Sequence, residues 1–290
     1  MSNSSEKIFE IRQANEEDVQ IFCDWAAMEG WNPGLRDIQC FYGADKSGFY
    51  IGWLGTEPIA CISAVKYGKS HGFIGFYIVR EDQRGKGYGL RIWNHAMASL
   101  EGRIVGLDGV VDQQDNYAKS GFVLAYRNIR FEGVAPELAQ ADRAEGSIPV
   151  SDVSAIAQHL LVEYDGLHFF TERKTFLSCW LKGEGHEGLA VLDQGKVVGY
   201  GVMRPYADGY KLGPLFAENG QIAEELFMTF CRKVPGSNII LDVPEENAAA
   251  VELAERYQLK QSFETARMYR NGTVDLPLTQ IFGVTSFELG

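Results

Sequence analysis

The order of elements expected along the chain occurs twice, and this repetition constrains the possible folds more than any other feature. Residues 52–63 have the pattern of a strand, a turn and a second strand, and 138 positions later residues 190–201 have the same pattern. The same shift places Gly75 on Gly213, and an amphipathic helix follows in each copy, at 87–100 and 220–233. Strands that alternate with helices predict α/β units around a mixed sheet.

The two copies also end alike. A short apolar strand that ends in aspartate, 104–108 and 239–242, precedes a second helix and an aromatic-rich strand, 122–131 and 263–270. We expect each aromatic strand to close its own unit, and the last stretch, 280–289, to return to a sheet because of its strand composition. Gly, Pro, Ala and charged residues at 132–147 predict a linker. We therefore expect two domains, about 1–135 and 146–290, which suits a chain of 290 residues.

The composition is that of an ordinary globular protein, with 46% apolar and 23% charged residues. No run of apolar residues is long enough for a membrane span, and the first seven residues have the character of a disordered lead and not of a signal peptide. The net charge of −12 argues against nucleic acid as a partner, and it is compatible with a cationic substrate such as an amine.

The cysteines are scattered and never form a Cys-x-x-Cys pair. This pattern predicts a reducing, cytoplasmic setting with no structural disulfide and no metal site. The five positions are Cys23, Cys40, Cys61, Cys179 and Cys231.

A basic, glycine-rich turn lies between an apolar strand that ends in Ile78 and Val79 and the first amphipathic helix. Small residues let the main chain approach a ligand, and amides at a helix N-terminus together with cations favour a diphosphate. A leucine after the last glycine excludes the P-loop, and Asp108, about twenty positions on, keeps a dinucleotide site open as an alternative. The turn consists of Arg84, Gly85, Lys86, Gly87, Tyr88 and Gly89.

This turn resembles the acetyl-CoA signature of the GNAT acetyltransferase superfamily (Arg/Gln-x-x-Gly-x-Gly/Ala). The stretch Tyr117-Ala-Lys-Ser-Gly-Phe122 matches a second family pattern, Tyr-x-Lys-x-Gly-Phe. The resemblance implies an acetyl-CoA-dependent N-acetyltransferase with direct transfer to an amine. It also implies that residues 84–89 hold the diphosphate, that the strand splays or bulges so that main-chain groups of Ile78 and Val79 meet the pantetheine arm, and that Tyr117 protonates the leaving thiolate.

Only the first copy keeps these features. The corresponding loop of the second copy, 216–223, lacks both cations and gains Glu218, and Ala254 occupies the tyrosine position. We therefore expect acetyl-CoA in the first domain and a degenerate cofactor loop in the second. Asn247 matches a family asparagine that touches pantetheine, so residual binding there stays open. Further motifs at 31–34, 72–79, 165–173, 209–214 and 267–269 resemble a group of tandem GNAT proteins.

The sequence indicates less about the residues that bind the acceptor. The resemblance implies that Trp31 and Asn32 lie near the acceptor, a small-molecule amine or an exposed protein amine. For Trp31, a position that simply covers the core stays open as an equal alternative. In the second domain, polar residues stand among aromatics and predict either a lined cavity or buried ion pairs such as Asp165–Arg173. These candidates are Asp165, His168, Arg173 and Arg204.

The general base stays open, with Asp108 and His71 as candidates that also fit a structural role. Two other functions remain as alternatives to the acetyltransferase: a non-catalytic acyl-CoA sensor and a dinucleotide-dependent enzyme. The acceptor, the acyl chain and the oligomeric state are not indicated by the sequence.

Overall fold

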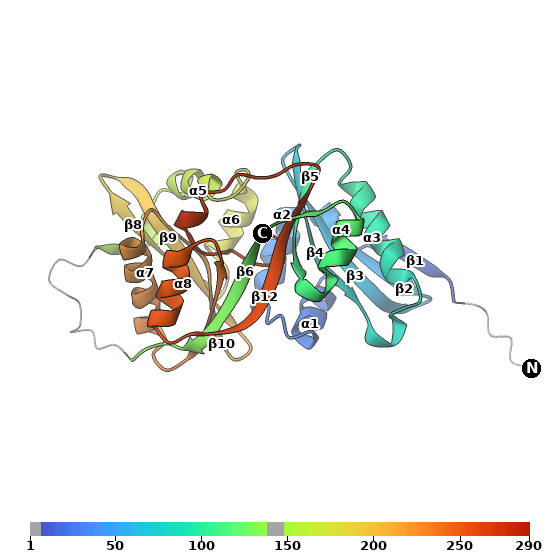
Figure 1. Cartoon of the computed structure of the whole chain (residues 1–290), viewed down its shortest axis with the longest axis horizontal. Helices are drawn as coiled ribbons and strands as arrows, with labels where there is room; N and C mark the ends of the chain where they lie inside the picture. Colours follow the sequence, from blue (N-terminus) through green and yellow to red (C-terminus); the bar gives the residue numbers. More distant parts are fainter. Residues whose placement is uncertain (1–6, 138–147) are drawn as a thin grey trace, which may run out of the picture.

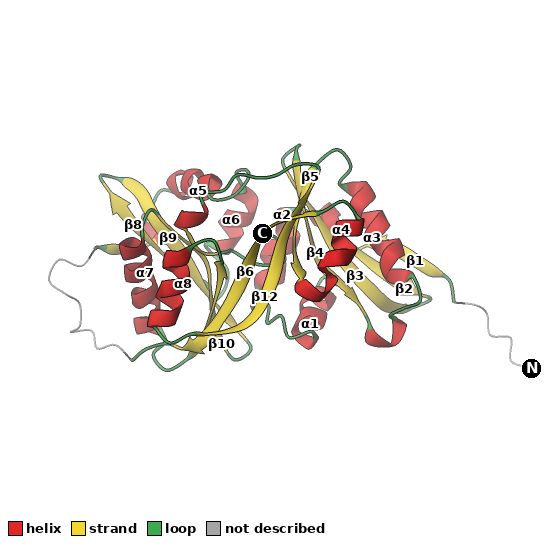
Figure 2. Ribbon diagram, viewed as in Figure 1, coloured by secondary structure: helices red, strands yellow, loops and turns green. Residues whose placement is uncertain are grey.

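One mixed sheet of 13 strands runs through the length of the molecule (Figure 2). The computed structural model describes residues 7–137 and 148–290. The strands follow one another in the order β1-β2-β3-β4-β5-β12-β6-β11-β10-β9-β8-β7, and β13 pairs with β10. The expected α/β fold with a mixed sheet is therefore confirmed. None of the helices in the described ranges is long and apolar enough to cross a membrane.

The elements of the two halves repeat one another as expected. The first half contains β1 (Phe9–Gln13), α1 (Gln20–Met28), α2 (Asp37–Ala44), β2 (Phe49–Leu54), β3 (Glu57–Tyr67), β4 (His71–Val79), α3 (Tyr88–Ser99), β5 (Ile104–Val110), α4 (Gln114–Lys119) and β6 (Val123–Val134). The second half contains β7 (Val150–Asp152), α5 (Gln158–Leu167), α6 (Lys174–Trp180), β8 (Glu187–Asp193), β9 (Lys196–Tyr206), β10 (Gly209–Ala217), α7 (Gly220–Lys233), β11 (Asn238–Pro244), α8 (Ala248–Arg256), β12 (Lys260–Arg270) and β13 (Ile281–Gly283).

The aromatic strands β6 and β12 are exchanged between the halves. They lie side by side at the centre of the molecule, where β12 pairs with β5 of the first half and β6 pairs with β11 of the second (Figure 1). The prediction that each strand closes its own unit is therefore wrong. Ile129 and Phe131 of β6 pack in the second-half core, whereas Met268 of β12 packs in the first-half core. Residue periodicity predicts a strand but does not identify the strand beside it.

One face of the sheet carries a core that both halves share. Helices α1 and α2 meet α5 and α6 there, and the Phe41 ring stacks on Trp180 with 5.6 Å between centroids. A disulfide joins Cys40 of α2 to Cys179 of α6. The expectation of no structural disulfide is therefore wrong. The two cysteines are 139 residues apart, and only the packing of α2 on α6 brings them together.

The other face carries the two helices that the repeat predicts. Helix α3 packs on the first-half strands through Ile92 and Trp93, and α7 packs on the second-half strands through Leu226 and Phe230. Residues 281–290 are buried throughout, and β13 confirms that this segment returns to the sheet. The predicted lead at 1–6 and most of the predicted linker, 138–147, lie outside the described residues; 132–134 belong to β6.

Candidate active site

A cavity of about 500 Å³ opens where β4 and β5 separate. The two strands pair in parallel only from His71–Ile104 to Ile74–Leu107. Beyond that point the register of β4 on β3 shifts, and Phe76 in the shifted stretch has a φ of 48°. A bulge of this kind redirects a strand and leaves main-chain groups unpaired. The expected splay of β4 before the glycine turn is therefore confirmed.

The glycine turn lines one end of this cavity. Gly85 and Gly87 have φ values of 76° and 83°, and a Cβ at either position would meet nothing within 4 Å. Gly87 precedes α3 without a capping side chain, and the first amides of a helix have no partner within the helix. The open space, the glycine conformation and the helix N-terminus together fit an anionic group such as a diphosphate.

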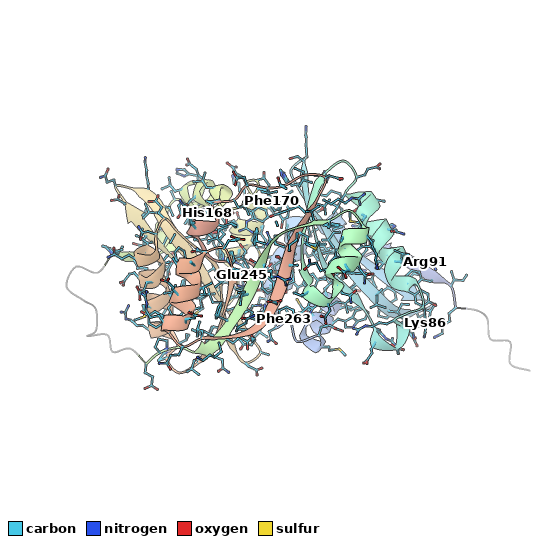
Figure 3. The ribbon with its side chains drawn as sticks, in the orientation of Figure 1. Lys86, Arg91, His168, Phe170, Glu245 and Phe263 are labelled. Atoms are coloured by element: carbon cyan, nitrogen blue, oxygen red, sulfur yellow. A yellow bond between two sulfur atoms is a disulfide. The ribbon has the colours of Figure 1, made fainter. Side chains whose placement is uncertain are left out.

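The two cations of the turn have different environments. Arg84 donates to the Val79 carbonyl at 2.8 Å and forms an ion pair with Glu29. Lys86 donates to the Asp82 carbonyl at 2.8 Å and lies toward the outer end of the first half (Figure 3). Of the predicted donor-binding residues, the cavity lining includes Ile78, Val79, Arg84, Gly85, Gly87 and Gly89, but neither Lys86 nor Tyr88.

Tyr117 lies in α4 and lines the cavity opposite β4. Its ring lies against Gly109 of β5, where a Cβ would come within 2.2 Å of it, and 5.6 Å from the Trp93 ring. Burial raises the pKa of Tyr117 to about 12, so the hydroxyl keeps its proton at neutral pH. Within the described residues this hydroxyl forms no hydrogen bond, so its proton is available to a bound molecule.

Aromatic side chains from distant parts of the sequence form another wall of the cavity. Trp31 comes from the loop after α1, and Phe263 and Phe287 come from the second half; Phe263 lies near the centre of the molecule (Figure 3). Arg130 of β6 holds this wall together. It donates to the Trp31 carbonyl at 2.9 Å, and its guanidinium lies 5.0 Å from the Phe287 ring centre. The sequence does not predict that Phe263, Phe287 and Glu288 line the cavity, because only the strand exchange and the path of residues 281–290 bring them here.

The cavity lining includes three carboxylates, Glu29, Asp108 and Glu288. Asp108 accepts two hydrogen bonds from Arg267, at 2.8 and 2.6 Å, and one from Asn128 at 2.8 Å. Burial raises the pKa of Asp108 and Arg267 opposes that shift. The carboxylate oxygens of Asp108 already accept hydrogen bonds from Arg267 and Asn128, which fits the structural role considered for Asp108 above.

The polar candidates of the second half lie outside the cavity lining. Asp165 and Arg173 form the predicted buried ion pair, with two hydrogen bonds of 2.8 Å. Arg173 also donates to the Thr285 hydroxyl at 2.7 Å. His168 is buried between the Tyr164 carbonyl, at 2.9 Å, and Gln280, at 3.0 Å. Of the two alternatives, the ion pair is the one that the structure contains.

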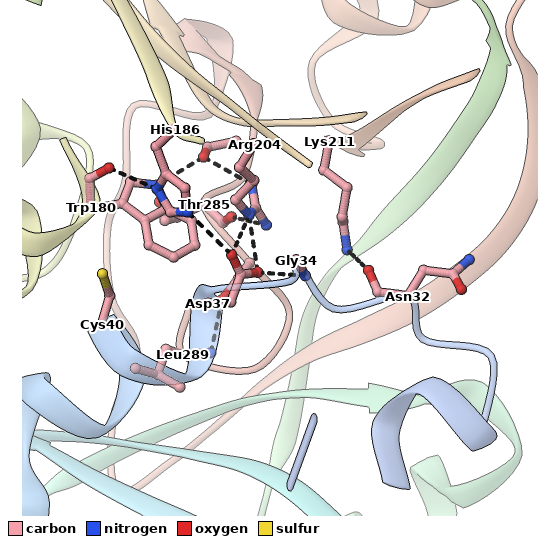
Figure 4. Close-up of polar contacts among 12 residues, drawn as sticks. Asn32, Gly34, Asp37, Cys40, Trp180, His186, Arg204, Lys211, Thr285 and Leu289 are labelled. Carbon is pink, nitrogen blue, oxygen red and sulfur yellow. Dashed lines mark hydrogen bonds and ion pairs between the residues drawn. The ribbon is translucent and has the colours of Figure 1, made fainter. Parts of the chain in front are cut away.

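Arg204 and Asn32 belong to a second polar cluster, shown in Figure 4. Arg204 lies 3.0 Å from both carboxylate oxygens of Asp37 and donates to the Thr285 carbonyl at 3.2 Å. Lys211 donates to the Asn32 carbonyl at 3.0 Å (Figure 4). Arg173 and Arg204 therefore both hold the segment 281–290 through Thr285.

His71, the other base candidate, also lies outside the cavity lining. Its Nδ1 is 2.9 Å from the Ser70 hydroxyl, and its ring stacks on Phe170 with 5.0 Å between centroids. These contacts fit a structural role.

The second half has the same strand separation, but its own chain fills the gap. Parallel pairing of β10 with β11 ends at Leu212–Leu241, and β13 then pairs with β10, placing Gly283 opposite Leu215. Asn247 donates to the Ile281 carbonyl of β13 at 2.9 Å. The asparagine that the family resemblance places against pantetheine therefore contacts a strand of this chain.

Comparisons with known proteins give concordant results. Residues 7–122 match the acetyltransferase (GNAT) family, and residues 161–283 match an acetyltransferase (GNAT) domain. Holothin acyltransferase of Pseudoalteromonas sp. (strain SANK 73390) is 34% identical over 280 residues, which cover 96% of this chain and 94% of the relative.

Two solved structures have the same fold. The first, from Pyrococcus horikoshii, has a TM-score of 0.81 at 20% identity, covering 97% of this chain and 96% of that one. The second, a tandem GNAT protein from the clavulanic acid biosynthesis pathway, has a TM-score of 0.63 at 13% identity, covering 93% and 100% of the two chains.

Proposed function

This chain belongs to the GNAT family of acyltransferases, with two such domains in tandem, and on that premise we propose that it transfers an acetyl group from acetyl-CoA to an amine. Members of this family use acyl-CoA donors. The observation that carries the proposal is the open separation of β4 and β5, which ends at a glycine turn and is lined by Tyr117. The separation in the second half is filled by β13, so one donor site is expected per chain.

The residues of the cavity fit the parts of such a donor. Gly85, Gly87 and the first turn of α3 would hold the diphosphate, because open space and amides meet there. Main-chain groups of Ile78 and the N–H of Val79 would pair with the pantetheine amides, since β4 is separated from β5 at these residues. The Val79 carbonyl already accepts from Arg84. The donor supplies a thioester, whose carbonyl carbon is open to attack by an amine.

Tyr117 is proposed to complete the transfer. As the bond between nitrogen and carbon forms and the bond between carbon and sulfur breaks, negative charge collects on the sulfur. Thiols have pKa values near 8.5, and the pKa of Tyr117 is raised to about 12, so the hydroxyl is protonated when transfer begins. It then donates its proton to the sulfur as the charge develops.

The acceptor is proposed to be a small-molecule amine. The name of the 34% identical relative gives holothin as the compound on which that enzyme acts. The aromatic wall of the cavity suits a flat acceptor of that kind. The dinucleotide alternative depended on Asp108 as the acidic residue that binds the ligand. The carboxylate of Asp108 instead accepts hydrogen bonds from Arg267 and Asn128, so this alternative loses its main support.

The proposal is tested by measuring thiol release from acetyl-CoA with a panel of small amines and amine-bearing peptides. We expect turnover with at least one small amine. Gly87→Ala should reduce donor binding at least tenfold, because a side chain there strains the left-handed backbone and enters the donor space. Gly220→Ala, at the start of α7 where φ is not positive, is the matched control and should bind normally.

Acetyl-CoA binding with no turnover of any amine would favour the acyl-CoA sensor. Binding of NAD in place of coenzyme A would favour the dinucleotide enzyme. Turnover with peptides alone would move the acceptor from small molecules to protein amines.

A further inference from the structure

We propose that Glu288, carried into the cavity by the last buried segment of the second half, takes the proton from the acceptor amine during transfer. This inference rests on the proposed acetyl transfer and names the base for it. It makes the second half part of the catalytic machinery, because residues 281–290 contribute a reacting group to a donor site built by the first half.

The first observation is the place of Glu288. The segment 281–290 leaves the second-half gap at β13 and comes against β4 at Gly75. A Cβ on Gly75 would lie 2.0 Å from the Glu288 carbonyl oxygen, so only glycine allows this approach. Gly75 follows Ile74, the last residue of β4 that pairs with β5. Glu288 therefore lines the cavity where β4 and β5 separate, together with Phe287 and Tyr117.

The second observation is that Glu288 lacks the partner that comparable acids have. Four aspartates with almost fully buried carboxylates each pair with a buried arginine: Asp37 with Arg204, Asp108 with Arg267, Asp165 with Arg173 and Asp242 with Arg130. Glu288 is only 3% exposed, yet within the described residues its carboxylate forms no hydrogen bond and no ion pair. A buried, unpaired carboxylate costs free energy, and such groups concentrate at functional sites.

The other carboxylates of the cavity are less suited to accept a proton. Arg267 and Asn128 occupy the oxygens of Asp108. Glu29 is paired with Arg84 at the donor end, and its side chain is 35% exposed. Glu288 keeps its oxygens free beside the aromatic wall, where the acceptor is expected.

The surroundings of Glu288 make its carboxylate a stronger proton acceptor than an exposed carboxylate. Removal from water raises the pKa of its carboxyl group, and the carboxylate of Asp37 raises it further. Lys211, Arg130 and Arg204 lower it and keep the charged form accessible. The pKa of Lys211 is itself lowered to about 8 by burial, so Lys211 remains largely cationic at pH 7. A base is most effective when its pKa approaches the working pH.

Glu288 and Tyr117 together account for both proton transfers of the reaction. The amine nitrogen bonds to the carbonyl carbon and gives its proton to a Glu288 oxygen. The carbon–sulfur bond breaks, its electron pair goes to sulfur, and Tyr117 gives that sulfur a proton. Glu288 then loses its proton to water and Tyr117 regains one, so the products are the amide and the free thiol. Arg173 and Arg204 act as positioning residues, because they hold Thr285, three residues before Glu288.

The test compares Glu288→Gln with wild type in three measurements. We expect kcat to fall at least 100-fold, since general bases contribute about 10²–10⁴. The decline of kcat/KM toward acidic pH, which reports protonation of the base, should vanish in the residual activity. Affinity for coenzyme A, measured by titration calorimetry, should stay within twofold of wild type. Glu264→Gln is the matched control. Glu264 lies on β12 between two cavity residues, pairs with Arg127 and lies outside the cavity lining, so the pH profile should be unchanged.

A second variant covers the case in which Glu288→Gln does not fold. Lys211→Met removes a cation that lowers the pKa of Glu288, so the acidic decline should move to higher pH. Wild-type rates in Glu288→Gln, or an unmoved decline in Lys211→Met, would overturn the assignment while the proposed function stands. Absence of acetyl transfer by the wild-type protein would instead overturn the proposed function, and this inference with it.

Discussion

Buried charges hold the site together at the scale of single residues. Arg130 pairs with Asp242 and supports the aromatic wall through Trp31 and Phe287. The ion pairs of Arg173 and Arg204 hold Thr285 in the same way. Loss of one partner from a buried pair costs about 3–5 kcal/mol, because the other charge is left uncompensated. The buried arginines therefore fix strands and loops, whereas Tyr117 and Glu288 have no hydrogen-bond or ion-pair partner among residues 7–137 and 148–290.

The first prediction concerns Tyr117. Tyr117→Phe removes the proposed proton donor and keeps the ring against Gly109 and Trp93. We expect kcat to fall on the order of 100-fold with coenzyme A affinity retained, because the lost group acts on the developing thiolate. Steady-state thiol release and calorimetry measure the two quantities.

The control for this variant is Tyr257→Phe in the second half. Its hydroxyl donates to Glu224 at 2.7 Å, and Tyr257 does not line the cavity. This variant should keep wild-type kcat. Equal rates for Tyr117→Phe and wild type with every acceptor would contradict the role of Tyr117.

Tyr117 and Glu288 differ in how far the sequence can identify them. Tyr117 belongs to a local motif beside Phe122, and Gly85 and Gly87 belong to a local turn, so neighbouring residues predict their placement. Glu288 depends on a path from β13 to Gly75, which joins residues more than 200 positions apart. Asp165 and Arg173 show the opposite case. Their polarity among aromatics was visible in the sequence, but only the structure distinguishes an ion pair from a cavity lining.

At the scale of elements, the same strand separation has two different outcomes. Between β4 and β5 the gap stays open and carries the cavity. Between β10 and β11 the gap receives β13, and Asn247 bonds to it. The sequence predicted the weaker second site from the loss of cations and of the tyrosine. It could not predict the filling strand, because strand composition at 280–289 does not specify a partner.

The second prediction concerns the contact of α2 with α6. Reduction of the Cys40–Cys179 disulfide should lower the free energy of unfolding by about 2–4 kcal/mol, because the bond closes a long loop of the unfolded chain. Denaturant unfolding with and without dithiothreitol measures the difference. The matched control is the double variant Cys40→Ala/Cys179→Ala, which should not respond to dithiothreitol.

Thiol titration checks the state of the starting protein. Oxidised, unfolded protein should show the three free cysteines Cys23, Cys61 and Cys231. Five reactive thiols in protein purified without reductant would contradict the pairing.

At the scale of the whole molecule, the exchange of β6 and β12 ties the two repeats into one body. Each half lends its last long strand to the centre of a sheet that spans both (Figure 1). The cavity is likewise built by both halves: its lining includes residues of β4, β5 and α4 from the first half and of β12 and 287–288 from the second. We propose that the units 1–135 and 146–290 are repeats in sequence but not independent folding units.

The third prediction follows from this exchange. Fragment 1–137 alone should not give a native thermal transition, because β12 is missing between β5 and β6. The intact protein should unfold in one cooperative transition by calorimetry. The matched control is a chain cleaved at an engineered protease site between 137 and 148, in which both pieces remain present and should stay folded and active. A fragment that melts like the whole protein would contradict the coupling.

The fold class and the repeat could be predicted from the sequence. Both depend on local periodicity and on positions that correspond between the two copies, such as Gly75 and Gly213. The strand exchange could not be predicted, since β6 and β12 have similar sequence patterns and each could pair with either β5 or β11. The aromatic wall could not be predicted either, because Phe263 reaches the cavity through the strand exchange and Phe287 through the path of residues 281–290.

We propose that the gap between β4 and β5 binds the donor, whereas the chain itself fills the gap between β10 and β11. Calorimetric titration of the intact protein with coenzyme A distinguishes the two gaps. We expect one molecule bound per chain, with binding weakened at least tenfold by Gly87→Ala and unchanged by Gly220→Ala. Two molecules per chain, or binding that Gly220→Ala weakens and Gly87→Ala does not, would contradict it.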